Sequence, residues 1–280
     1  IEKWYEAPSP IDTLEQRGES LTSNYNHRFN LRFDWTINKN MSLMSRTNFS
    51  FQGNDPFSQS YGEQWGETAE GKGLPYEILY NGSQSSSRAL RFSEFLQYRV
   101  KLGKDGRTIT VDGRYAIRNT LRSNANSFST LGTLFADNIA EPNLRYVSSF
   151  APQGETDISA NFTSAEPVAK NAQVSMQYRF DFEDQDIEKT AYITNAINPA
   201  NPFDSANFNI TGLMPDAELS SMTDSRSIEH RVGPGFRYSK ARNTFIANVY
   251  YQHSTLDGMV KGENIKRDFD HITYFVMGNI

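Results

Sequence analysis

Three regularly spaced aromatic residues are the first candidates for a binding site in this 280-residue chain. Phe57, Tyr61 and Trp65 follow one another at intervals of four positions. Exposed aromatic rings are strong binding anchors, so these three could stack on a sugar, a peptide or a siderophore. They could equally pack their own segment against itself. We take Phe57, Tyr61 and Trp65 as the candidate ligand-binding residues.

A group of carboxylates is a second candidate site. Asp181, Glu183, Asp184 and Asp186 lie where a predicted strand enters a long loop. Hard oxygen ligands at such spacing could hold calcium, but the central glycine and terminal glutamate of an EF-hand loop are missing. A solvated loop base is the interpretation we favour.

The other reactive residue types give no support for catalysis. The four histidines, at positions 27, 230, 253 and 271, lack metal-ligand spacing. The segment 66–72 matches the first seven positions of a phosphate-binding loop motif, but the eighth position is Gly73, and the motif needs a magnesium-binding Ser or Thr there. No nucleophile elbow or ordered triad can be picked out. We therefore expect a protein that is not an enzyme and that has no cofactor and no metal.

Charge and hydropathy restrict the partners. The formal net charge is -5, whereas a nucleic-acid-binding domain would show a basic excess, so no nucleic-acid partner is expected. The longest apolar runs, such as 274–277, are only a few residues long, and a spanning helix needs about 20. A membrane role would therefore need strands.

Alternation with a period of two is the main structural signal, and it predicts half-buried strands. The clearest run lies between Tyr25 and Ile37, where the odd positions are mostly apolar and the even positions polar. Ordinary globular strands have roughly five or six residues, so this strand is long. The same pattern recurs as four hairpins with turns near residues 39, 105, 168 and 241, followed by a ninth strand from Phe269.

Some positions break the alternation. Ser45 and Thr47 weaken the apolar face of their strand, and Glu94 and Phe95 fall out of phase with theirs. Pro234 has no backbone N–H to donate to a neighbouring strand, so a β-bulge or an edge strand is predicted there.

The connections between the hairpins are predicted to be long loops at 53–87, 119–153, 184–227 and 254–267, rich in Ser, Asn, Gly, Asp and Pro. Short turns on one side and long loops on the other are typical of transmembrane barrels. In hydrocarbon, strands can span only as a closed barrel, because every backbone group must be paired. The sequence therefore predicts an all-β fold: a transmembrane antiparallel up-and-down β-barrel with lipid outside, a polar lumen, and its long loops outside the cell.

An odd strand number points to a segment of a larger barrel, since bacterial single-chain barrels generally have an even number. Residues 1–24 look like a loop that follows a truncated strand, and no signal peptide opens the sequence. We expect residues 1–280 to be a segment of one outer-membrane β-barrel domain, without plug or signal peptide.

Short motifs resemble the barrel part of TonB-dependent outer-membrane receptors. They are Arg32-Phe33-Asp34-Trp35, Asn38-Lys39-Asn40-Met41, Asn48-Phe49-Ser50 and Glu166-Pro167-Val168-Ala169-Lys170-Asn171. The resemblance is to the outer-membrane β-barrel family of nutrient receptors with a carboxypeptidase-regulatory-like domain ahead of the plug, from about Tyr25 to Ile280. It implies a 22-stranded barrel in the cell outer membrane that takes up a glycan, peptide or siderophore. The implied partners are outer-membrane lipid, the protein's own plug domain, the TonB complex and a surface lipoprotein.

Two alternatives stay open. A passive porin or a surface adhesion barrel shares this architecture but lacks a plug and energy coupling. A soluble β-sandwich or lipocalin-like barrel also alternates apolar and polar residues, with the apolar ones inside. Strand length and the unequal connections favour the membrane barrel over the soluble domain.

Overall fold

The computed structural model describes residues 2–4, 13–65, 67–68, 71–72, 77–103, 105–130, 144–194, 198, 200–260 and 262–279. Nearly all of them are in strands, which confirms the predicted all-β fold. The elements are β1 (Glu2–Trp4), β2 (Thr13–Asn38), β3 (Met41–Trp65), β4 (Glu67–Thr68), β5 (Gly71–Lys72), β6 (Glu77–Lys101), β7 (Thr108–Thr130), β8 (Leu144–Phe150), β9 (Gln153–Ala169), β10 (Ala172–Thr194), the 3-10 helix η2 (Ser205–Phe208), β11 (Ser221–Lys240), β12 (Asn243–Val260) and β13 (Glu263–Asn279). No helix in this described part is long and apolar enough to cross a membrane.

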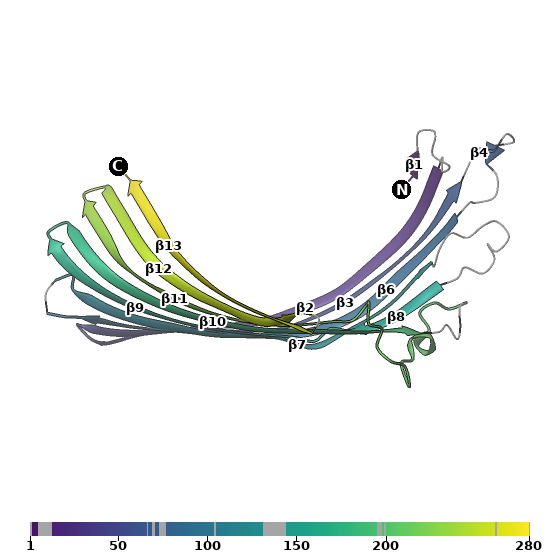
Figure 1. The fold of residues 1–280 in the computed structure, drawn as a ribbon, viewed down its shortest axis with the longest axis horizontal. Coiled ribbons are helices and arrows are strands. Elements are labelled where there is room, and N and C mark those ends of the chain that lie inside the picture. Colours follow the sequence, from purple (N-terminus) through teal and green to yellow (C-terminus); the bar gives the residue numbers. More distant parts are fainter. Residues whose placement is uncertain are drawn as a thin grey trace.

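The main sheet is an antiparallel meander in which strands pair with their neighbours along the chain. Its order is β1-β2-β3-β6-β7-β8-β10-β11-β12-β13, with β9 paired to both β7 and β10. The sheet is bent into a barrel-like trough (Figure 1). This confirms the predicted up-and-down order. Within the described residues, β13 pairs with β12 alone, so its other edge has no described partner.

β8 and β9 together fill one strand position. β9 pairs with Thr108–Thr120 of β7, and β8 pairs with Asn124–Thr130 of the same strand. Both also pair with β10, so the pairings of β7, β8, β10 and β9 close in a ring. Between β8 and β9 lie Ala151 and Pro152, and a proline cannot donate to a ladder. With β8 and β9 counted once, the described sheet has the nine principal strand positions that the alternation predicts.

The strands are much longer than expected. β2 has 26 residues, whereas about 9–11 tilted residues cross a bilayer. The predicted loops 53–87 and 119–153 are therefore largely wrong, since strands continue through most of both segments. The predicted loop 184–227 is too long at both ends, because β10 continues to Thr194 and β11 begins at Ser221, but a long connection does lie between these two strands. Around Gly262, with φ 84°, β12 turns tightly into β13, so 254–267 is not a loop either. Residues 13–24, predicted to be loop, belong to β2.

The short turns lie where they were predicted. Lys39 and Asn40 join β2 to β3, and Lys170 and Asn171 join β9 to β10. Between β6 and β7, Gly103 and Gly106 have φ of 63° and 88°, a region that glycine adopts without steric cost. These turns gather at one end of the sheet (Figure 1).

Pro234 produces a gap in the ladder, not the predicted bulge or edge. Gly233 and Pro234 pair with β10 but with no residue of β12, and the register on either side of the gap is unchanged. A Cβ on Gly233 would lie 1.9 Å from the carbonyl oxygen of Val249. The two backbones therefore approach so closely here that only glycine fits.

Candidate functional site

Cross-strand rows give the sheet one apolar face. Directly paired residues of neighbouring strands project from the same face. One row runs through Trp35, Leu43, Tyr98, Val111, Phe162, Tyr178, Val232, Tyr251 and Ile272. Every member is apolar or aromatic, so the apolar face extends without interruption across the nine strand positions in this row.

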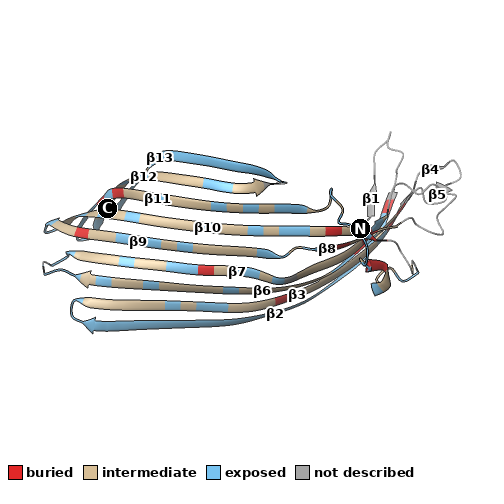
Figure 2. Ribbon diagram, turned by 60° about the horizontal axis from the view of Figure 1, so that its bottom comes forward, coloured by how far each residue is buried: buried red, intermediate tan, exposed pale blue. Residues whose placement is uncertain are grey.

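On β9 and β10 the apolar face is the more exposed one over much of each strand. On β9, Ile158 is 39% and Phe162 is 41% exposed, whereas Asp157, Ser159 and Asn161 between and beside them are only half-buried. Figure 2 shows this mixture of exposed and half-buried residues along the strands. Side chains diverge on the convex side of a curved sheet and converge on its concave side. The apolar face is therefore convex and the polar face concave.

A polar group interrupts the convex face. The hydroxyls of Ser45 and Thr47 donate to the two carboxylate oxygens of Glu94, at 2.6 and 2.5 Å. This accounts for the weak apolar positions and for the out-of-phase glutamate together. Phe95, the other out-of-phase residue, points to the concave face, because it pairs with Arg46 and Arg114.

In part of the concave face the charges are segregated by sign. Three consecutive polar rows begin at Arg28, Asn30 and Arg32 of β2. On β2 to β7 their charged members are Arg28, Arg32, Arg46, Arg91, Arg114 and Arg118. On β9 to β11 they are Glu155, Asp157, Asp181, Glu183 and Glu229. In these three rows an arginine half and an acidic half therefore lie side by side. The next row towards the short turns has the opposite order, with Asp34 and Asp112 on β2 and β7 and with Arg179 and Arg231 on β10 and β11.

Comparison of the chain with known proteins finds no relative that could indicate a function. The chain matches no protein-family model, and no curated protein matches it. Function must therefore be argued from the two faces of the sheet.

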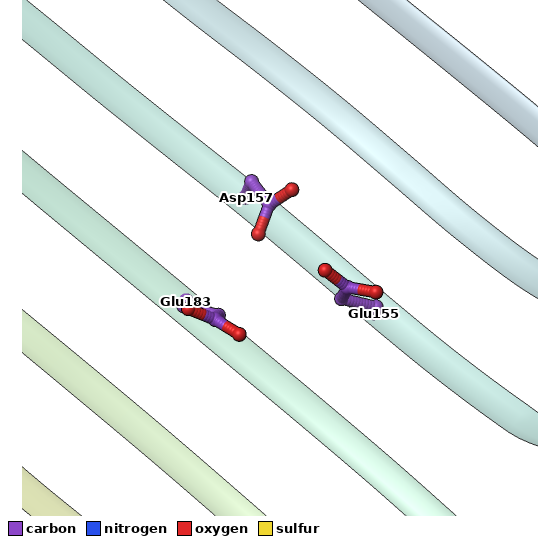
Figure 3. A group of neighbouring side chains, drawn as sticks. All are labelled: Glu155, Asp157 and Glu183. Atoms are coloured by element: carbon purple, nitrogen blue, oxygen red, sulfur yellow. The ribbon is translucent and has the colours of Figure 1, made fainter.

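The two halves meet at Arg118. Its guanidinium donates to Glu155 and, at 2.9 Å, to Asp157. Glu183 reaches the same place from the neighbouring strand, and oxygens of the three carboxylates lie within 4.8 Å of one another (Figure 3). Carboxylates so close could hold a cation, but Arg118 already supplies a positive charge to two of them. We interpret the group as an ion-pair network that joins β7 to β9.

Removing that arginine gives the first prediction. Arg118→Ala leaves three carboxylates together without their cation and should lower the free energy of unfolding by about 1 kcal/mol, the scale of a partly exposed ion pair. Urea titration of the protein in detergent measures this. Arg99→Ala, which removes an arginine with no described ion pair from the same face, is the control, and an equal loss in both variants would contradict the network.

The predicted acidic cluster does not converge. Asp181 and Glu183 point to the concave face, whereas Asp184 and Asp186 alternate to the other. Arg179 Nη2 donates to Asp181 at 2.7 Å, and Arg226 Nε donates to Asp184 at 3.0 Å. The structure therefore divides these carboxylates between two faces, and nothing gathers all four around one ion.

The predicted ligand-binding aromatics belong to β3 and not to a loop. The ring of Phe57 packs against Phe203, with centroids 4.9 Å apart, and Tyr61 meets the edge of Tyr80 at 6.2 Å. Burial and a hydrogen bond to Glu63 raise the pKa of Tyr61 to about 12, so its hydroxyl remains a donor at neutral pH. The side chain of Trp65 lies outside the described residues. Ligand binding by these three residues stays a prediction.

An aromatic cluster at this end of the sheet was not predicted. Phe128 and Tyr146 are almost fully buried and pack with Phe208 of η2, and Phe203 covers Phe128 from the same connection. The cluster continues the convex face, since Phe57 lies an even number of positions from Phe49 on β3. The only sequence signal for it is the presence of two phenylalanines in the polar segment 198–210.

Proposed function

We propose that this chain forms part of the wall of an outer-membrane β-barrel and that the barrel takes up a nutrient as a TonB-dependent receptor does. The observation that carries the proposal is the arrangement of the faces: apolar side chains lie on the exposed convex face, and polar side chains lie on the concave face. A soluble domain buries its apolar side chains, and large exposed apolar areas mark contacts with a membrane or a partner.

The dimensions support the membrane part of the proposal. The alternating segment Tyr25–Ile37 is 13 residues long, slightly more than the roughly 9–11 needed by a tilted spanning strand. The apolar row next to the short turns and the apolar residues above it form the outward band that a lipid bilayer requires. The strands then continue beyond the bilayer, where both of their faces meet water.

The receptor part of the proposal is supported by the resemblance of the motifs between Arg32 and Asn171. This resemblance implies a glycan, a peptide or a siderophore as the transported ligand. It also implies the plug domain, the TonB complex and a surface lipoprotein as partners. A polar concave wall suits either a plug or a solute in the lumen. A passive porin or an adhesion barrel would share the wall but would have no plug.

Cysteine labelling tests the membrane topology without background, because the chain contains no cysteine. Met214, which is 86% exposed in the long connection before β11, and Lys39, in the turn between β2 and β3, are each replaced by cysteine in the full protein. A membrane-impermeant maleimide added to intact cells should label the M214C variant. It should label the K39C variant only after the cells are permeabilised.

Labelling of both variants in detergent serves as the control for reactivity. Reaction of K39C on intact cells, with M214C protected, would reverse the proposed orientation. Recovery of both variants in the soluble fraction, without detergent, would contradict the membrane barrel itself.

A further inference from the structure

We propose that the arginine half of the concave face binds a small solute that carries several oxyanion groups, such as carboxylates, sulfates or phosphates. The inference rests on the proposed function, since it takes the concave face to be the lumen of a barrel. It adds a chemical class of cargo that the motifs do not specify.

The arginines surround a hollow. A pocket of about 360 Å³ is lined by Arg28 of β2, Arg91 of β6, and Arg114 and Arg118 of β7. Its other lining groups include Asn30, Asn48, Ser50 and Ser93, all neutral. No carboxylate lines it. The volume is within the range of small-molecule sites, roughly 300–1,000 Å³.

Three of these four guanidiniums have N–H donors that no described carboxylate accepts. Among the described residues, Arg91 and Arg114 make no hydrogen bond or ion pair. Arg28 donates to the amide oxygen of Asn26, at 3.3 Å, which leaves its charge without a counterion. Arg118 alone is neutralised, by Glu155 and Asp157.

Strand register holds these charges close together. Arg91 pairs directly with Arg118 on one side and with Ser50, the partner of Arg28, on the other. Neighbouring strands are about 4.8 Å apart, and like charges directly opposite destabilise a sheet. A bound anion would remove that repulsion. The guanidinium fork also matches the two oxygens of a carboxylate or phosphate group.

The acidic half confines such a solute. The five carboxylates on β9 to β11 have only Arg118 and Arg179 as described ion-pair partners, so negative charge is in excess on this half of the three rows and repels an anion. The bonds from Arg118 mark the boundary between the halves. A solute with several oxyanions would therefore lie over β2 to β7. The neutral Asn and Ser side chains there can hydrogen-bond its remaining oxygens.

Equilibrium binding to the full protein in detergent micelles tests the proposal. The probes are citrate and inorganic triphosphate, measured by calorimetry at low salt. The double variant Arg91→Gln with Arg114→Gln should raise the Kd of both probes at least about tenfold, or roughly 1.4 kcal/mol. Arg99→Gln removes an arginine from the same strand and face, eight positions further on, and should leave the Kd nearly unchanged. Heat-modifiable migration in gels checks that each variant is folded.

Three results would overturn the proposal. The first is that the folded wild type binds neither probe, and the second is that Arg99→Gln weakens binding as much as the double variant. The third is that an aspartate-rich peptide binds in an Arg91- and Arg114-dependent manner while citrate and triphosphate do not, because the arginines would then hold a protein segment. If the protein inserts as proposed but fails these tests, only the inference of an anionic cargo is wrong. Failure of insertion would instead defeat the proposed function.

Discussion

Arginine at Leu31 should prevent stable insertion of the barrel, whereas arginine at Asn30 should be tolerated. Leu31 is 53% exposed on the convex face, and Asn30 lines the concave pocket. A charged side chain on the lipid face near the bilayer midplane costs about 2–4 kcal/mol, but one in the lumen meets water. Refolding of the full protein into lipid vesicles, followed by urea titration, measures the difference.

Phe33→Arg is a second test of the same face, because Phe33 lies two positions further along β2 and is equally exposed. It should behave like Leu31→Arg. If Leu31→Arg and Asn30→Arg fold equally well in vesicles, the assignment of the convex face to lipid is wrong, and with it the membrane barrel.

Truncation of Phe128 should have an effect of similar size at the other end of the sheet. Phe128 is 2% exposed, and its ring lies 5.0 Å from that of Tyr80 and 4.9 Å from that of Phe203, measured between centroids. Phe128→Ala removes a buried ring that the rigid strands cannot replace, at a cost of about 3–5 kcal/mol. The expected results are a lower free energy of unfolding and faster cleavage by chymotrypsin within 200–220.

Phe150→Ala supplies the matched control. Phe150 is on β8, four positions from Tyr146, but it is 38% exposed, and its one ring contact among the described residues is with the edge of Tyr192, at 6.5 Å between centroids. Its truncation should cost less than that of Phe128. Equal losses, or unchanged cleavage in Phe128→Ala, would show that the cluster does not hold the connection against the sheet.

The sequence alone predicts those parts of the strands in which one face carries apolar side chains and the other carries polar side chains. Between Tyr25 and Ile37 the alternation is nearly perfect, and β2 lies where it predicts. Residues 81–87 of β6, Asn-Gly-Ser-Gln-Ser-Ser-Ser, show no alternation. Cross-strand hydrogen bonds still hold them in the sheet, because both faces of an extended strand in water can be polar. Periodicity therefore gives the position of each strand but underestimates its length.

The candidate site was less predictable, since it depends on which strands pair and in which register. Arg28, Arg91 and Arg118 are far apart in sequence and look like ordinary polar alternates of three different strands. Only the pairing of Arg91 with Ser50 and Arg118 brings them together. The separation of arginines from carboxylates arises in the same way, so single-strand patterns contain no signal for it.

The contact between Phe57 and Phe203 implies an order of assembly. Hairpins of neighbouring strands bring together residues that are close in sequence, and such local contacts form early and quickly. Phe57 and Phe203 are 146 positions apart, and β6 to β10 lie between them along the chain. Their contact requires those strands to be in place, so the aromatic cluster should form after β2 to β10 have paired. Folding would then proceed hairpin by hairpin, and the connection before β11 would pack against β3 and β7 only once β2 to β10 are paired.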